Sequence, residues 1–155
     1  MHRCGSVRAT LVKWDMYEIV EHYNFVATHE ISGLRPTHPC HGVHMHQWSV
    51  EVVLHSAGLL PTNAPAETSA LEPLRRYVMS ELEGRHLNDL LVGEPTPARL
   101  AGHLADWCRC HLAAFVVETL QGISVSAGRT SRSRYLVSRG HGNGQRGKRC
   151  SCDQS

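Results

Sequence analysis

Two strand-like runs flank a loop rich in Gly, Pro and His, and this pattern constrains the fold most. The run at 17–31, YEIVEHYNFVATHEI, holds β-branched and aromatic residues and no Gly or Pro, which is typical of a long strand. Residues 32–43, SGLRPTHPCHGV, predict a loop. In the run at 44–54, alternate positions place six side chains on one face of a second strand: His44, His46, Trp48, Val50, Val52 and Leu54. We expect the two strands to pair as a hairpin.

Two helices and two short strands are predicted after this hairpin. Ser69 and Glu72 form a capping box with Pro73 in the first turn, and Gly84 marks the end of that helix. Its apolar residues recur at helical spacing: Leu71, Leu74, Val78 and Leu82. Thr96 is the expected N-cap of a second helix, and Pro97 is its first residue. The side chains predicted to line its inner face are Leu100, Leu104, Trp107 and His111. The runs AAFVVETL at 113–120 and GISVSAG at 122–128 are interpreted as strands.

The order β-β-α-α-β-β indicates an α+β fold in which two helices cover one face of an antiparallel sheet. We assign residues 1–128 to one domain with its core at 17–128, which suits a chain of 155 residues. Residues 129–155 hold seven of the sixteen Lys and Arg and one acidic residue, and form a basic tail rich in Gly, Ser and Arg. Its last part has no aromatic side chain for base stacking, so we expect disorder rather than a nucleic-acid site.

The chain shows no targeting signal or membrane segment. Its first residues carry charges and lack an apolar run of roughly 7–15 residues, and no stretch approaches the ~20 apolar residues of a membrane span. We therefore expect a cytoplasmic protein without membrane partners. In that compartment the six cysteines are expected to be free thiols.

Three histidines on the two predicted strands form a candidate metal site. His44 and His46 are two residues apart and must point the same way, and His29 shares a strand face with Phe25 and Ala27. A catalytic zinc takes three protein ligands and keeps a fourth position for water or substrate. An isolated His-x-His pair is a weak signal, because a strand histidine is usually a packed or exposed residue. The residues around the pair decide how strongly it indicates a metal site.

Those surroundings resemble the 6-pyruvoyltetrahydropterin and 6-carboxytetrahydropterin synthase family. The family pattern is F-x-A-x-H, a loop, and then C-x-x-x-H-G-H-x-[YW]-x-V-x-V. The chain matches it, except for the central Gly, with Phe25, Ala27, His29, Cys40, His44, Met45, His46, Trp48, Val50 and Val52. Downstream, H-L-N at 86–88, Pro95-Thr96 and Glu118-Thr119 match further family segments.

The resemblance implies the tunnelling fold, whose subunits join their sheets into a ring and assemble as a hexamer or another trimer-based homo-oligomer with active sites between subunits. It implies Zn²⁺ on His29, His44 and His46, and Cys40 as the thiol that exchanges protons on the substrate. It also implies that Glu118, with Thr119, anchors a pterin-like small molecule through bidentate hydrogen bonds.

The chain departs from the family in the catalytic half. The family's L-D-H-x-x-L-N is here Leu82, Glu83, Gly84, Arg85, His86, Leu87 and Asn88, so the Asp-His dyad is absent. Glu83 could keep the carboxylate, and His86 or His41 could supply an imidazole. Three of the candidates also have simpler interpretations: His41 as a polar loop residue exposed to solvent, Cys40 as a loop cysteine with no role, and Glu118 as an acid at an edge position with access to water.

Two functions remain open from the sequence, besides a third interpretation in which the zinc is purely structural and its chelation unfolds the protein. The first is a zinc-dependent lyase or cyclase, with metal polarisation and proton abstraction acting on a pterin or on a non-standard polyol or carbonyl compound in specialised biosynthesis. The second is a non-catalytic pterin- or purine-binding homologue that keeps zinc and Glu118. Neither interpretation involves a nucleic acid.

Overall fold

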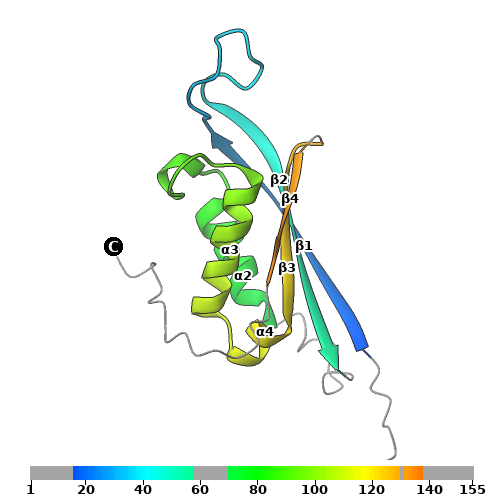
Figure 1. The fold of residues 1–155 in the computed structure, drawn as a ribbon. Coiled ribbons are helices and arrows are strands. Elements are labelled where there is room, and N and C mark those ends of the chain that lie inside the picture. Colours follow the sequence, from blue (N-terminus) through cyan, green and yellow to red (C-terminus); the bar gives the residue numbers. More distant parts are fainter. Residues whose placement is uncertain (1–15, 58–69, 130, 138–155) are drawn as a thin grey trace, which may run out of the picture.

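A long hairpin forms the first half of the domain. The computed structural model describes residues 16–57, 70–129 and 131–137. Strand β1 (Met16–His29) pairs antiparallel with β2 (His44–Ala57) over its whole length, from Met16 opposite Ala57 to His29 opposite His44. The predicted hairpin is confirmed, and the loop at 30–43 extends beyond its end (Figure 1).

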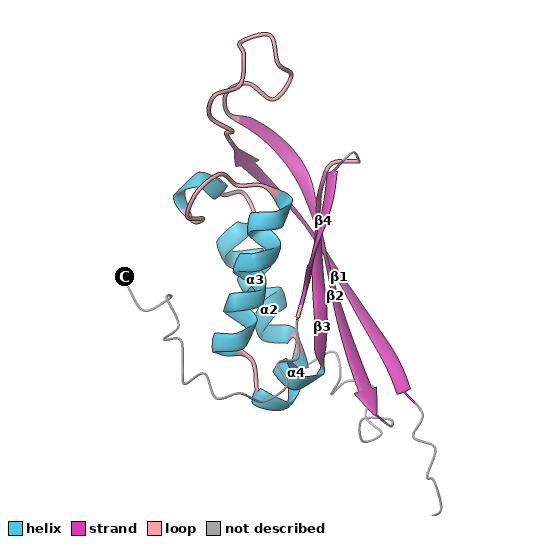
Figure 2. Cartoon of the chain, in the orientation of Figure 1, coloured by secondary structure: helices cyan, strands magenta, loops and turns pink. Residues whose placement is uncertain are grey.

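Two further strands complete an antiparallel sheet in the order β1-β2-β3-β4. Strand β3 (Leu120–Ala127) pairs with β2, with a register shift at Val53 and Leu54, and β4 (Ser131–Leu136) pairs with β3. The helices all lie on one face of this sheet (Figures 1 and 2). The predicted α+β arrangement of four strands and a helical layer is therefore confirmed.

The first helical segment changes type part-way. Helix α2 (Glu72–Tyr77) continues as a π-helical turn, η1 (Val78–Leu82), and a short 3₁₀ turn, η2 (Leu87–Asp89), follows. Gly84 ends this helical segment in the left-handed region, with φ of +70°, as predicted. Ser69 of the expected capping box lies outside the described residues, and Leu71 occupies the N-cap position.

Helix α3 (Pro97–His111) begins as the sequence predicts, because the Thr96 side chain accepts a hydrogen bond from the Arg99 N–H. Its buried face holds Leu100, Ala101, Leu104, Ala105 and Cys108. Trp107 is half-buried and packs against the core, as predicted, whereas the inner position predicted for His111 is wrong because its side chain is exposed. The Trp107 ring stacks on His111 at 4.4 Å and on Tyr77 at 4.6 Å.

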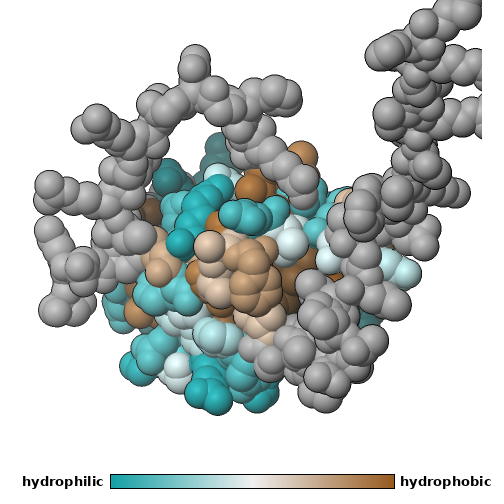
Figure 3. Space-filling model, turned by 90° about the horizontal axis from the view of Figure 1, so that it is seen from below, coloured by the Kyte–Doolittle hydropathy of each residue, from teal (hydrophilic) through white to brown (hydrophobic). Residues whose placement is uncertain are grey.

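The segment predicted as a third strand at 113–120 is instead helix α4 (Ala114–Thr119). Leu112, Val116 and Leu120 are buried while Phe115 and Glu118 are exposed, which is a spacing of four residues rather than alternation. Seen from below, where α4 lies, the surface carries an apolar patch ringed by hydrophilic side chains, and Phe115 is 55 % exposed (Figure 3). The strand at 122–128 is confirmed as most of β3.

The fourth strand comes from residues that the charge pattern placed in a tail. Strand β4 pairs with β3 throughout, and its Tyr135 lies opposite Ile123 and packs against the core. Residues 131–137 therefore belong to the domain, and the boundary predicted at residue 128 is too early. The disorder predicted for the last part of the tail concerns residues outside the described part of the chain.

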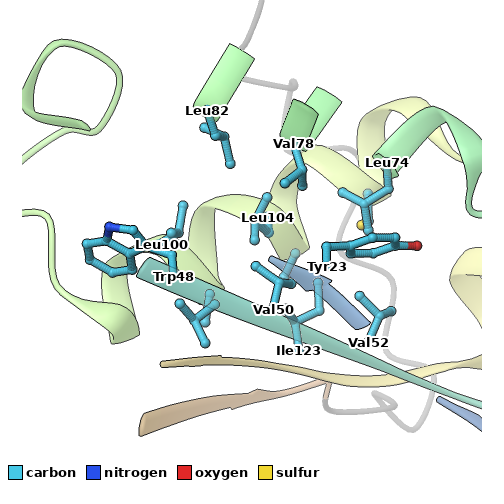
Figure 4. Close-up of a cluster of buried hydrophobic side chains, with 14 of the residues drawn as sticks. Tyr23, Trp48, Val50, Val52, Leu74, Val78, Leu82, Leu100, Leu104 and Ile123 are labelled. Atoms are coloured by element: carbon cyan, nitrogen blue, oxygen red, sulfur yellow. The ribbon is translucent and has the colours of Figure 1, made fainter. Parts of the chain in front are cut away.

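The core lies between the sheet and the helices. Tyr23, Trp48, Val50, Val52 and Ile123 of the sheet meet five helical side chains: Leu74, Val78, Leu82, Leu100 and Leu104 (Figure 4). Within the described residues no helix is long and apolar enough to cross a membrane. Cys40 and Cys108 are free thiols, whereas Cys110 is disulfide-bonded, which corrects the prediction for that residue.

Candidate metal centre

The three predicted ligands meet where β1 ends and β2 begins. His29 lies directly opposite His44 in the strand register, and His46 follows two residues later on the same face. The ring centroids are 4.4 Å apart for His29 and His44, 4.8 Å for His44 and His46, and 5.2 Å for His29 and His46. One nitrogen from each ring lies within 4.8 Å of the others. In the described part of the chain this is the only cluster of three or more such donors with metal spacing.

Backbone carbonyls fix the tautomer of two of these rings. His29 Nδ1 lies 2.8 Å from the Pro95 carbonyl oxygen, and His44 Nδ1 lies 2.8 Å from the Gly42 carbonyl oxygen. A carbonyl oxygen only accepts, so each Nδ1 carries the proton and each Nε2 keeps its lone pair. This is the outer-shell arrangement that orients metal-binding histidines in proteins.

The Nε2 atoms of His29 and His44 are buried, and no described residue offers either of them a hydrogen-bond partner. Buried polar atoms nearly always have a partner, so two such lone pairs in one cluster need an explanation. A bound cation supplies it. Burial also lowers the pKa of His29 and His46, which favours the neutral ring that binds a metal. The three nitrogen donors therefore fit Zn²⁺, which at catalytic sites takes three protein ligands and keeps a fourth position for water or substrate.

Cys40 lies on the loop between the two ligand strands, four residues before His44. Its thiol is partly exposed, and its N–H donates to Nδ1 of His38 at 3.0 Å. The loop is also held by His41, whose Nδ1 lies 3.1 Å from the Leu34 carbonyl oxygen. Cys40 and His41 thus belong to the loop that joins the two ligand strands.

Glu83 and His86 lie along the free edge of β1, in a segment that we call the strap (residues 83–95). Glu83 Oε2 accepts the Val26 N–H at 2.9 Å, and His86 Nδ1 lies 3.1 Å from Thr28 Oγ1. A parallel bridge joins Thr28 to His86. Both candidate replacements for the dyad therefore have a structural partner on β1.

Glu118 and Thr119 lie at the opposite end of the domain. They belong to α4, which is far from the tip of β1 and the start of β2 in the ribbon view (Figure 1). Glu118 is exposed, and the Thr119 hydroxyl donates to the Val116 carbonyl oxygen at 2.9 Å. Within one chain, the fold does not bring Glu118 to the histidine cluster.

Three strap residues around the cluster were not among the predicted site residues. Pro95 holds His29, Asn88 binds both backbone groups of Glu30 at 2.8 Å, and Glu94 accepts from the N–H and hydroxyl of Ser32. The H-L-N and Pro-Thr segments marked Asn88 and Pro95 as matches to the family, but no sequence pattern indicated that these residues contact the end of β1.

Comparison with known proteins now gives the family. Residues 18–138 match the sequence profile described as 6-pyruvoyl tetrahydropterin synthase. The chain belongs to this family. The match spans both ligand strands, the strap and β4, so the candidate metal centre lies wholly inside it.

Two solved structures show the same fold. The 6-pyruvoyl tetrahydropterin synthase of Caenorhabditis elegans superposes with a TM-score of 0.67 at 14 % identity, covering 83 % of this chain and all of that one (100 %). An uncharacterized protein from Wolinella succinogenes superposes with a TM-score of 0.62 at 17 % identity, covering 78 % of this chain and 98 % of that one. No curated protein sequence matches the chain.

Proposed function

We propose that this member of the 6-pyruvoyl tetrahydropterin synthase family is a zinc-dependent lyase or cyclase of the pterin-synthase type. The observation that carries the proposal is the pair of buried Nε2 lone pairs on His29 and His44, which converge with His46. The family profile over residues 18–138 supports the reaction class.

His29, His44 and His46 would hold the metal through one nitrogen each. When bound, zinc supplies Lewis-acid polarisation of a substrate carbonyl or hydroxyl, which acidifies a neighbouring C–H. The chain's own groups set up the site for this chemistry. The carbonyls of Pro95 and Gly42 hold the protons of two imidazoles on Nδ1, so that the ligand nitrogens stay neutral.

Cys40 is the proposed base that takes and returns the proton. The thiolate is the form that accepts a proton, and positive charge nearby favours it. Cys40 supports this role by its place on the loop between the two ligand strands and by its partial exposure, which leaves the thiol open to a substrate. His41 stands beside it on the same loop and is a candidate proton acceptor for the thiol.

His86 is the better placed of the two strap candidates for a proton-transfer role. It is bonded to Thr28, the residue next to His29, and among the described residues nothing hydrogen-bonds its Nε2. The Glu83 carboxylate, by contrast, accepts the Val26 N–H and so satisfies a backbone donor at the outer edge of β1. We therefore assign the imidazole role to His86 and propose that Glu83 helps to place it.

A neighbouring subunit would complete the site. Glu118, the proposed anchor for the pterin, lies at the far end of its own domain, so it can serve the histidine cluster only of another copy. Strand β4 and the part of β1 before Val26, which the strap does not cover, lie at the edges of the sheet and could pair between copies. We propose a homo-oligomer in the cytoplasm that acts on a small-molecule substrate.

The direct test is incubation of the zinc-loaded protein with dihydroneopterin triphosphate, followed by mass spectrometry. Formation of 6-pyruvoyl- or 6-carboxytetrahydropterin is the expected result. The Cys40→Ala variant should keep its zinc and lose this conversion, while a matched Cys108→Ala variant should keep both, because Cys108 is buried in the core away from the cluster.

A second function is favoured by the missing Asp-His dyad. In that case the protein binds a pterin or purine without turnover and retains the zinc and Glu118. Tight pterin binding by isothermal titration, with no product from any pterin tested and no effect of Cys40→Ala, would replace the enzymatic proposal with this one.

A further inference from the structure

We infer that Asn88 and Glu94 are positioning residues for the metal centre, because they fix the backbone on either side of the contact that orients His29. The inference rests on the proposed zinc site. Neither side chain would touch the metal or the substrate. Each would act through His29.

His29 needs such support because it is the last residue of β1 and belongs to the last pair of the hairpin. The pairing of β1 with β2 ends at His29 opposite His44, and the connection that follows, residues 30–43, has no strand partner. The ends of paired elements fray unless other groups hold them. A ligand at the last pair of a hairpin would therefore lose its place if residues 30–32 moved freely.

The strap holds this part of the chain through hydrogen bonds to every second residue along the outer edge of β1 and its continuation. Gly84 N–H donates to the Val26 carbonyl at 2.7 Å, and Thr28 N–H donates to the Arg85 carbonyl at 2.9 Å. Alternate residues of a strand direct their backbone groups to the same side, so the same edge continues through residues 30 and 32. Beyond residue 28 the strap holds this edge with side chains instead of its backbone.

Asn88 takes over at Glu30, the residue next to His29. Its Oδ1 accepts the Glu30 N–H at 2.8 Å, and its Nδ2 donates to the Glu30 carbonyl at 2.8 Å. An amide side chain used in this way replaces a strand partner, since it satisfies both backbone groups at once. The backbone leaving His29 is thereby fixed in direction.

Glu94 connects Ser32 to the residue that orients the imidazole. Its carboxylate accepts the Ser32 N–H at 3.2 and 3.3 Å and also accepts the Ser32 hydroxyl. The next residue, Pro95, places its carbonyl 2.8 Å from His29 Nδ1. Hydrogen bonds to a charged acceptor are about twice as strong as neutral ones. Glu94 thus links the start of the 30–43 loop to Pro95, whose carbonyl oxygen accepts the hydrogen bond from His29.

The test is Co²⁺ titration of the metal-free full chain, followed through the visible absorption of tetrahedral Co²⁺ and by competition with a chelator. The variants are Glu94→Ala, Asn88→Ala and the conservative Glu94→Gln, which keeps one acceptor oxygen. The control is Glu18→Ala, which removes an exposed carboxylate bonded to His55 at 2.9 Å at the other end of β1.

We expect Glu94→Ala and Asn88→Ala to weaken Co²⁺ binding by about tenfold, as outer-shell changes do, and to alter the visible spectrum. Glu94→Gln should recover part of the affinity, and Glu18→Ala should match the wild type. A wild-type affinity and spectrum in both alanine variants would overturn the inference, even if their urea midpoints fell. If Glu94→Ala does not fold, Ser32→Ala tests the same contact, with the same expected loss of affinity. A wild-type chain that binds no Co²⁺ would instead overturn the proposed metal site.

Discussion

At the scale of single residues, the candidate site depends on the tautomers that the backbone imposes on its histidines. Two Nδ1 protons are held by carbonyl oxygens, and the opposite nitrogens are buried without a partner. Such an arrangement costs stability without a cation, because unpaired polar atoms have been removed from water. We therefore expect the metal-free chain to be less stable than the metal-bound one, by an amount that grows with free zinc.

Removal of one ligand should abolish stoichiometric metal binding. His44→Ala leaves two nitrogen donors, which is fewer than zinc sites in proteins use, so zinc content should fall from about one ion per chain to a small fraction. His22→Ala, which changes an exposed histidine of the same hairpin, should leave it unchanged. Zinc analysis after gel filtration measures both, and an equal zinc content in the two variants would contradict the ligand assignment.

Acid should weaken the metal-free fold. Burial lowers the pKa of His29, His46 and His103, so the unfolded chain binds more protons than the folded one as the pH falls below the ordinary value of 6.5. The free energy of unfolding should then decrease between about pH 6.5 and pH 5. Urea titrations at several pH values measure this. His103→Gln, which lies outside the metal cluster, should show a shallower decrease than the wild type, and an unchanged slope would contradict the account for that residue.

At the scale of elements, the strap and the helical segment before it meet at Gly84. This residue has a φ of +70°, and a Cβ placed there would find open space. Only the backbone conformation therefore opposes a larger residue. The turn matters because the Gly84 N–H starts the series of bonds to the edge of β1.

Two glycine substitutions should have opposite effects. Gly84→Ala should lower the free energy of unfolding by about 1 kcal/mol, since an L-residue is strained in the left-handed region. Gly102→Ala, in the middle of α3 with Tyr135 only in ordinary contact at 4.0 Å, should raise it by up to about 1 kcal/mol. Urea unfolding of both variants decides the matter, and a shift in the same direction would contradict this description of the turn.

Sequence patterns predicted the elements in which residue types and the period of burial agree, and failed where the two conflict or where the element is polar. Alternation in β2 placed His44 and His46 on one face, and the hairpin register then brought His29 opposite them. Helix α4 was mistaken for a strand because its Val and Phe residues favour strands, although its buried positions recur every four residues. Strand β4 was missed because its SRSRYL run is polar and partly exposed at a sheet edge. The strap contacts depend on tertiary placement, which no local pattern contains.

At the scale of the whole molecule, the distance between α4 and the histidine cluster is the feature that points to assembly. A site that needs both Glu118 and Cys40 can form only between copies of the chain (Figure 1). In the described part of the chain the helices cover one face of the sheet, so the other face, strand β4 and the part of β1 before Val26 remain for contacts with neighbours.

Mixing two inactive variants tests this shared site. Cys40→Ala and Glu118→Ala should each be inactive alone. Oligomers formed from an equal mixture should regain about a quarter of the wild-type activity, because random pairing rebuilds an intact site in that share of the interfaces. The assay is product formation after joint refolding, with separately refolded and unmixed variants as the control. No recovery in verified mixed oligomers would mean that each site is built within one chain.

The central claim, that His29, His44 and His46 form an open three-nitrogen zinc site, is tested most directly by X-ray absorption at the zinc edge of the purified protein. The account predicts three imidazole nitrogens at about 2.0–2.1 Å and one further light atom from water or substrate. A zinc–sulfur distance of about 2.3 Å, or a coordination shell that survives His44→Ala unchanged, would contradict it.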